Sequence, residues 1–279
     1  MFLMDCTSPV LGIYPCGKCL NCRARSRQEW VFRLRMEYES SNFGLFVTLT
    51  YDDDHLPPDG VSRRDCQLFL KRLRSHFNSQ ALRYFLVSEY GDHTLRPHYH
   101  ALLFFQVERK NDIYDIIEQS WQNGNVQFGD IEEGSIVYCT KYCLKGSIIP
   151  PGSNENFRLL SKMNGGIGVK YIYDQPSLDL SEPSLAKLHG YVAPMPRYYR
   201  EKQLAVIPSD DRIDIRHRYQ EKCRLKRDKR LQNQLKLFAK THPDLDPIEL
   251  ERQFFYWRSE CNERKGDLAF KRTKKQNKW

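Results

Sequence analysis

Hydrophobic and polar positions follow two different periods in the first half of the chain. Between Ser62 and Phe77, apolar residues recur every three or four positions behind a serine that can cap a helix, which predicts an amphipathic helix. Around this helix, β-branched and aromatic residues gather in short runs that end at Asp, Pro and Gly clusters, which predicts strands. These runs are FGLFVTLTY (43–51), LRYFLVSEYG (82–91) and HYHALLFFQV (98–107).

Further segments complete a regular order of elements. The sequence predicts a helix at 22–39, a helix with one apolar face at 111–122, a strand at 125–133 and a helix at 135–146. From residue 43 the order is β-α-β-β-α-β-α, and its first six elements match the ferredoxin-like, split βαβ arrangement. We therefore expect an α+β fold whose antiparallel sheet carries helices on one face and leaves the other face open for a site.

Three regions are predicted along the chain. They are an N-terminal segment with cysteines and a helix (1–42), a core that holds the expected sheet (43–150) and a C-terminal extension with basic helices (151–279). Within the extension, the prolines of APMPRYYREK (193–202) predict an interruption of regular structure. The run RHRYQEKCRLKRDKRLQNQLKLFAK (216–240) predicts a strongly basic helix.

Charge and composition narrow the class of protein. The chain has 44 Lys and Arg against 35 Asp and Glu, a formal net charge of +9, which suits a polyanionic partner such as nucleic acid. No apolar run reaches the roughly 18 residues of a membrane span, and the start MFLMDCTSP lacks the pattern of a signal peptide. The chain contains no phosphate-binding G-x-x-x-x-G-K-[ST] loop, so no built-in ATP motor is predicted.

Cysteines suggest a reducing compartment and one candidate metal site. The chain has 9 cysteines, an odd number scattered along a basic sequence, which favours reduced thiols in a cytoplasm over a disulfide framework. In CGKCLNC, Cys16, Cys19 and Cys22 are separated by two residues each, and Cys6 is an available fourth thiolate. This spacing fits zinc or an iron–sulfur cluster, and the alternative is a group of free thiols around the start of a helix.

RPHYHALLF is the sharpest motif. Side chains alternate along a strand, so His98 and His100 point to one face, about 7 Å apart, and Tyr99 points to the other. Glu89 lies on the preceding strand, and an antiparallel hairpin brings it close to both histidines. One carboxylate and two imidazoles leave coordination positions open, which suits Mg²⁺ or Mn²⁺ acting as a Lewis acid.

The stretch VYCTKYCLK adds candidate nucleophiles. Tyr138 and Tyr142 share one face of the predicted helix, and Lys141 and Lys145 share a neighbouring face. Taken alone, tyrosines at this spacing are usually core residues with the hydroxyl at the rim. Because the helix follows the fourth strand, however, a phenolic oxygen could approach a metal-bound phosphate, and Lys141 could supply the charge that activates it.

At this point the motifs resemble a known family. FVTLTY, SEYG with RPHYHALLF, and YCTKYCLK resemble the three motifs of rolling-circle replication initiators of the HUH endonuclease superfamily. The arrangement Y-x-x-K-Y resembles the initiators of the Microviridae, small single-stranded DNA bacteriophages. CGKCLNCRARSRQEW and APMPRYYREK resemble their gokushovirus branch. The resemblance covers about residues 16–202, and Tyr99 stands where the family usually has another apolar residue between the histidines.

The resemblance implies a reaction and its partners. Glu89, His98 and His100 would hold a divalent ion that polarises the scissile phosphate of a viral replication origin, presented as single-stranded or supercoiled DNA. One tyrosine would attack, forming a 5′-phosphotyrosine link and freeing a 3′-hydroxyl. The second would cleave the regenerated site so that the ends can be joined. The host replicative helicase and polymerase would be partners, and the reaction would take place in the host bacterial cytoplasm.

Candidate DNA contacts and other functions stay open. Thr48 and Thr50, on the first strand, are expected to border the site, although a β-branched strand explains them equally well. Further candidate DNA contacts are basic side chains: Lys145, Arg224, Lys226 and Arg227. The alternative functions are a related HUH transposase or relaxase, an RNA-recognition-like module without catalysis, and an iron oxygenase that uses two histidines and a carboxylate.

Overall fold

The structure is a computed structural model. It describes residues 6, 15–77, 81–141, 149–174, 179–183, 185–188 and 191–275. The chain divides into two compact units, one formed by residues 33–171 and the other by residues 1–32 together with 172–278. Each unit is described by itself below.

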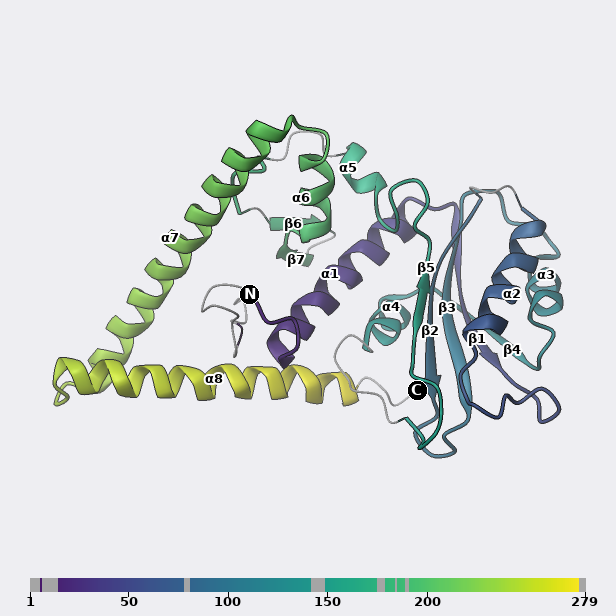
Figure 1. Cartoon of the computed structure of the whole chain (residues 1–279), viewed down its shortest axis with the longest axis horizontal. Helices are drawn as coiled ribbons and strands as arrows, with labels where there is room; N and C mark the ends of the chain where they lie inside the picture. Colours follow the sequence, from purple (N-terminus) through teal and green to yellow (C-terminus); the bar gives the residue numbers. More distant parts are fainter. Residues whose placement is uncertain are drawn as a thin grey trace. The chain divides into compact units, whose positions relative to one another are not determined.

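An antiparallel sheet forms the centre of the unit at 33–171. Its order is β4-β1-β3-β2-β5 (Figure 1). The bounds are β1 Phe43–Thr50, β2 Leu82–Tyr90, β3 Pro97–Phe105, β4 Val126–Asp130 and β5 Arg158–Leu160. The first four strands were expected, and their order β4-β1-β3-β2 confirms the predicted ferredoxin-like α+β fold. The edge strand β5, which pairs with β2, was not predicted.

Two helices, α2 (Arg63–Ser75) and α3 (Ile113–Trp121), cover one face of this sheet (Figure 1). Helix α2 begins as predicted, because the Ser62 hydroxyl accepts a hydrogen bond from the Asp65 backbone N–H at 3.2 Å. The strands alternate, so every second residue packs against the two helices. The main residues of this core are Leu45, Val47, Leu49, Leu86, Tyr99, Ala101, Leu103, Phe105, Phe69, Leu73, Ile117 and Trp121.

The opposite face of the sheet is covered at one end and carries polar residues at the other. Its covered end holds the buried side chains Phe85, Leu102 and Phe104. Arg83, on the same face of β2, forms an ion pair with Glu37 near the end of α1 (Leu20–Glu39). Helix α4 (Glu133–Thr140) also lies on this side, away from α2 and α3 (Figure 1). The expected open face is therefore a partly covered surface beside α4.

The other unit consists mainly of helices. Its elements are the hairpin β6 (Leu185–Leu188) and β7 (Tyr191–Pro194), α6 (Arg197–Leu204), α7 (Ser209–Thr241) and α8 (Pro247–Lys275), and the short helix α5 (Lys170–Asp174) contains the boundary between the units. Helices α7 and α8 pack through Phe238 and Phe254, whose ring centroids are 5.7 Å apart. None of the described helices is both long and apolar enough to span a bilayer.

The interruption predicted at 193–202 is wrong for most of that stretch. Helix α6 begins at Arg197, directly after Pro196, and Tyr199 is fully buried against Phe32 with ring centroids 5.9 Å apart. A proline that stands just before the first turn costs the helix no internal hydrogen bond, so it marks a helix start here.

Candidate metal and nucleophile site

The β2–β3 hairpin places the three predicted metal ligands on one face of the sheet. In the antiparallel register Glu89 lies directly opposite His98, and Thr48 on β1 lies opposite His100. Both histidines point to the face that carries α4. Tyr99, between them, is fully buried on the other face, with its ring centroid 5.7 Å from that of Trp121. The alternation inferred from RPHYHALLF is therefore present in the fold.

The three ligand groups converge on one point. Glu89 Oε2 lies 3.5 Å from His98 Nε2 and 3.3 Å from His100 Nε2. One ligand atom from each residue can be chosen such that all three lie within 4.8 Å of one another. Two of the three side chains, those of Glu89 and His100, are buried. Such a group could hold one divalent ion and leave other coordination positions for water or a substrate oxygen.

Contacts on the far side of each ring orient both imidazoles toward that point. His98 Nδ1 lies 3.1 Å from the Arg96 carbonyl oxygen, and His100 Nδ1 lies 3.0 Å from Thr48 Oγ1. A carbonyl only accepts, so His98 carries its proton on Nδ1 and presents the lone pair of Nε2. His100 Nε2 is buried, and no described residue makes a hydrogen bond of good geometry to it. A buried nitrogen without such a partner is costly, and a metal ion would satisfy it.

The electrostatics keep the carboxylate charged and the imidazole neutral. Burial opposes ionisation of Glu89, but the nearby His100 and His98 rings and the charge of Lys141 outweigh it, so the pKa of Glu89 lies well below its usual range. Burial is also the largest influence on His100 and lowers its pKa. Both groups are thus held in the protonation state that binds a metal.

Helix α4 brings a tyrosine to the same carboxylate. The Tyr138 hydroxyl donates a hydrogen bond to Glu89 Oε2 at 3.0 Å, and the Tyr138 ring lies edge-on to His100, with centroids 4.8 Å apart. Lys141 Nζ lies 3.0 Å from Glu89 Oε1 and 3.6 Å from the centroid of the Tyr138 ring. Burial, reinforced by the Glu89 charge, raises the pKa of Tyr138, so the phenol is protonated in this arrangement.

The remaining predicted residues lie in different places. Tyr142 and Lys145 are outside the described residues. Thr48 faces His100, whereas the Thr50 hydroxyl bonds the Asn125 carbonyl at 3.3 Å. Three belong to α7 and are exposed: Arg224, Lys226 and Arg227.

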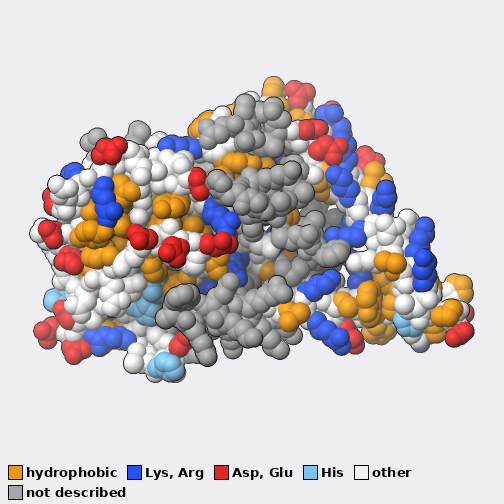
Figure 2. Space-filling model, turned by 180° about the vertical axis from the view of Figure 1, so that it is seen from behind, with side chains coloured by type: hydrophobic (Ala, Val, Ile, Leu, Met, Phe, Trp, Pro, Cys, Tyr) orange, Lys and Arg blue, Asp and Glu red, His pale blue; other side chains and the backbone are white. Residues whose placement is uncertain are grey.

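The basic residues of α7 do not form a continuous patch. Lys226 pairs with Glu182 at 3.4 Å and Arg227 with Asp228 at 3.4 Å. Figure 2 shows Lys and Arg side chains along the long helices at the right, interspersed with acidic and hydrophobic ones. Part of the positive charge of this helix is therefore neutralised locally.

One site residue was not predicted. Phe46 stacks on His100, with ring centroids 5.6 Å apart, and its centroid lies 6.4 Å from that of Tyr138. Strand alternation could have found it, because Phe46 and Thr48 are two residues apart on β1 and share a face. The packing of Phe46 holds the imidazole and the phenol in place from the side of β1.

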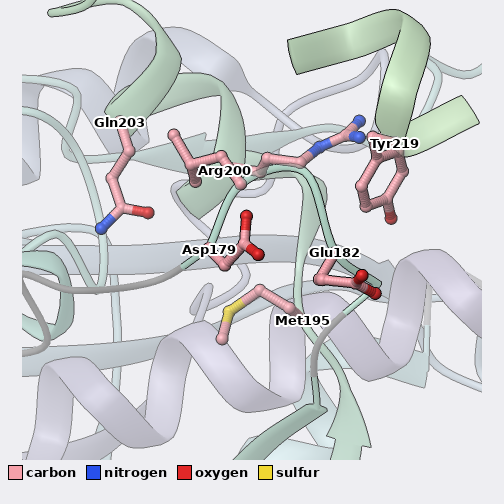
Figure 3. A pocket seen from close by; sticks show the side chains of 7 residues that line it. Asp179, Glu182, Met195, Arg200, Gln203 and Tyr219 are labelled. Carbon is pink, nitrogen blue, oxygen red and sulfur yellow. The ribbon is translucent and has the colours of Figure 1, made fainter. Parts of the chain in front are cut away.

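A separate hollow lies in the mainly helical unit (Figure 3). Arg200 and Tyr219 line it with Asp179, Glu182, Met195 and Gln203. The Arg200 guanidinium carbon stands 3.7 Å from the Tyr219 ring centroid, and Glu182 pairs with Lys222 at 2.5 Å. Because it contains none of the predicted site residues and its charges are paired, this hollow adds no catalytic group.

Comparison with known proteins follows the layout of this site. The family model for replication-associated proteins of the ORF2 type matches residues 44–147, a range that holds Glu89, both histidines and Tyr138. The replication-associated protein VP4 of Bdellovibrio phage phiMH2K is 30% identical over 209 residues, which cover 67% of this chain and 66% of that protein. No solved structure matches the chain.

Two further phage proteins are similar. The replication-associated protein ORF2 of Spiroplasma virus 4 is 28% identical, over 61% of this chain and 60% of that protein. The replication-associated protein ORF4 of Chlamydia phage 1 is 23% identical, over 73% of this chain and 56% of that protein. The alignments thus span about two thirds or less of each relative. The chain belongs to this family of phage replication-associated proteins, and the resemblance indicated by its three motifs is confirmed.

Proposed function

We propose that the chain is a metal-dependent, site-specific endonuclease and strand transferase that nicks a phage replication origin and so starts and ends rolling-circle replication. One observation carries the proposal. The Tyr138 hydroxyl lies 3.0 Å from Glu89 Oε2, and the same oxygen lies within 3.5 Å of both histidine Nε2 atoms. A candidate nucleophile and three candidate metal ligands thus share one atom. Membership in the phage replication-associated family supports the same function.

In this proposal the chain holds Mg²⁺ or Mn²⁺ through Glu89, His98 and His100. The ion, when bound, acts as a Lewis acid that withdraws charge from the scissile phosphate. Glu89 contributes a carboxylate kept ionised by its neighbours, and the imidazoles contribute Nε2 lone pairs. Thr48 and the Arg96 carbonyl keep the rings in the orientation that points these lone pairs inward.

Tyr138 is the proposed first nucleophile. Its oxygen attacks the phosphorus, a new P–O bond to tyrosine forms, and the bond from phosphorus to the 3′-oxygen breaks. The phenolic proton passes to solvent, and the departing 3′-oxygen takes a proton from solvent. Tyr138 must first give up its hydrogen bond to Glu89, because burial beside that carboxylate raises its pKa. Lys141, 3.6 Å from the ring centroid, supplies the positive charge that favours the phenolate.

Tyr142 is the proposed second nucleophile. It follows Tyr138 by one helical turn in the sequence, which suits two phenols that use one metal group in alternation. After one round of synthesis it cleaves the regenerated origin. The freed 3′-hydroxyl then attacks the first phosphotyrosine, which restores a phosphodiester bond, closes the circle and returns the first tyrosine to its phenol.

Partners follow from this reaction. The substrate is single-stranded or supercoiled viral origin DNA in the host bacterial cytoplasm, and Thr50, Lys145 and the α7 side chains Arg224, Lys226 and Arg227 are proposed to contact it. Cation contacts to phosphates make affinity fall with salt. The host helicase and polymerase would unwind and extend the nicked strand, because the sequence has no P-loop of its own.

A covalent assay tests the proposal. The chain is incubated with Mn²⁺ and 3′-labelled single-stranded oligonucleotides tiled over the phage genome, and labelled protein is sought on a denaturing gel. We expect an adduct that depends on Mn²⁺ and on one oligonucleotide sequence. The variant Tyr138→Phe/Tyr142→Phe should form none, whereas Tyr256→Phe, which alters a tyrosine that is 72% exposed on α8, should react normally. Binding without cleavage, or an adduct in the double variant, would contradict the assignment.

A further inference from the structure

Four thiols converge just before and at the start of α1. Cys16 Sγ lies 4.0 Å from Cys22 Sγ, and Cys19 Sγ lies 3.8 Å from Cys6 Sγ. All four sulfur atoms lie within 4.8 Å of one another. Zinc bound by thiolates at about 2.3 Å in a tetrahedron holds its sulfurs about 3.8 Å apart. The thiols are therefore already close to the corners that one tetrahedral ion requires.

The backbone around the cluster is arranged to receive thiolates. The backbone N–H groups of Lys18 and Cys19 donate to Cys16 Sγ at 3.4 and 3.3 Å, and that of Cys16 donates to Cys6 Sγ at 3.3 Å. Gly17 has φ +72, a left-handed conformation that lets the chain turn back so that both N–H groups face one sulfur. Hydrogen bonds of this kind favour the charged form of a thiol, which is the form that binds metal.

Helix α1 also lacks an anion at its N-terminus. It begins at Leu20 and has no acidic residue in its first turn. Cys19 and Cys22 flank that start, so thiolates there would supply the negative charge that a helix N-terminus favours. Free thiols would not, because they are neutral. The position of the cluster thus provides an electrostatic reason for metal-bound thiolates.

The spacing further selects the kind of metal centre. All four cysteines are free thiols in the structure, and each sulfur is close to the other three, so the group is not divided into two disulfide pairs. An iron–sulfur cluster would place several irons and bridging sulfides between its ligands. Sulfur atoms that all lie within 4.8 Å of one another leave room at their centre for a single ion.

We propose that Cys6, Cys16, Cys19 and Cys22 form a closed, mononuclear zinc site that ties the chain before α1 to the first turn of that helix. The four thiolates fill the coordination sphere, so no position remains for substrate and the role of the ion is structural. The site does not depend on the proposed nicking reaction, and its test reads metal content and coordination, not cleavage.

The experiment uses the full chain with His98→Ala/His100→Ala, which removes the second place where zinc could bind. Metal analysis of this protein, purified without added zinc, should find one zinc per chain. X-ray absorption at the zinc edge should find four sulfur neighbours at about 2.3 Å. Replacement by Co²⁺ should give the visible and charge-transfer bands of a tetrahedral tetrathiolate.

Matched variants locate the ion. Cys16→Ser and Cys22→Ser, in the same background, should lower zinc well below one per chain. Cys223→Ser, which alters a cysteine of α7 outside the cluster, should keep it. Absence of metal, iron in place of zinc, or nitrogen and oxygen neighbours at the zinc would overturn the proposal. These readouts come from protein with all four cysteines present, so a serine variant that fails to fold does not blur the result.

Discussion

The two clusters of potential metal ligands differ in how the chain builds them and in what they leave open. Glu89, His98 and His100 come from two paired strands, are three in number and lie next to a tyrosine from α4. The cysteine cluster gathers Cys6 and the CGKCLNC turn at the start of α1, and its four sulfurs complete a tetrahedron. Three hard donors leave room for a substrate, whereas four thiolates do not. Chemistry is therefore proposed at the first cluster and structural support at the second.

Chelation should separate the two clusters most clearly. An open group of three ligands exchanges Mg²⁺ or Mn²⁺ readily, whereas a closed tetrathiolate retains zinc. Dialysis against EDTA should abolish adduct formation while about one zinc per chain remains, and added Mn²⁺ should restore the reaction. The measurement pairs metal analysis with the adduct assay. Loss of zinc together with activity, or activity that returns only with Zn²⁺, would remove the distinction.

Removal of the imidazoles should have the next largest effect. His98→Ala/His100→Ala takes away two of three ligands, and the loss of several kcal/mol of Lewis-acid stabilisation corresponds to about a 10³-fold slower reaction. Adduct formation measured at saturating Mn²⁺ should fall by that order. His217→Ala, an exposed histidine of α7, serves as the control and should react at the normal rate. A double variant that retains most of its rate would mean that the metal is held elsewhere.

Lys141 should contribute less than the ligands. It lies 3.0 Å from Glu89 Oε1 and 3.6 Å from the Tyr138 ring centroid, so Lys141→Met removes a charge that favours the phenolate and keeps a side chain of similar length. A neighbouring charge shifts a pKa by about 1 to 3 units, so we expect the adduct rate to fall by roughly 10-fold or more. Lys141→Arg should recover part of it. A rate unchanged in Lys141→Met would assign Lys141 to packing alone.

Thr48 should have the smallest of these effects, through His100. Its hydroxyl lies 3.0 Å from His100 Nδ1, and loss of such a partner weakens metal binding by about 10-fold or somewhat more. Thr48→Val should raise the Mn²⁺ concentration needed for half-maximal adduct formation without changing the rate at saturation. Thr48→Ser, which keeps the hydroxyl, should restore it. A lower saturating rate with the same Mn²⁺ requirement would instead favour a direct contact between Thr48 and DNA.

Local patterns were enough to predict most of the core fold. The period-two runs and the Ser62 cap anticipated β1, α2, β2 and β3, because burial on one face writes the alternation directly into the sequence. Strand β5 was missed because it has only three residues and is defined by its pairing with β2 along the chain from 85 to 87. An edge strand that short carries no period of its own.

The site was predictable where one hairpin sets it and less so where distant segments meet. Glu89 and the histidines follow from strand alternation and a short connection. The bond between Tyr138 and Glu89 joins residues 49 positions apart, and that between Thr48 and His100 joins residues 52 apart. Such contacts depend on strand order and helix placement, which no local spacing specifies. For that reason Thr48 was expected to face DNA, whereas its hydroxyl faces an imidazole.

The central claim is that a tyrosine of α4 or of the residues just after it becomes covalently linked to DNA at the Glu-His-His group. The most direct test is mass spectrometry of the adduct formed with Mn²⁺ after nuclease and trypsin digestion. Trypsin cuts after Lys141, so Tyr138 and Tyr142 fall on separate peptides, 111–141 and 142–145. We predict a phosphonucleotide remnant on one of these two peptides, attached to its tyrosine, and in Tyr138→Phe only on the second. A remnant on any other residue would contradict the account.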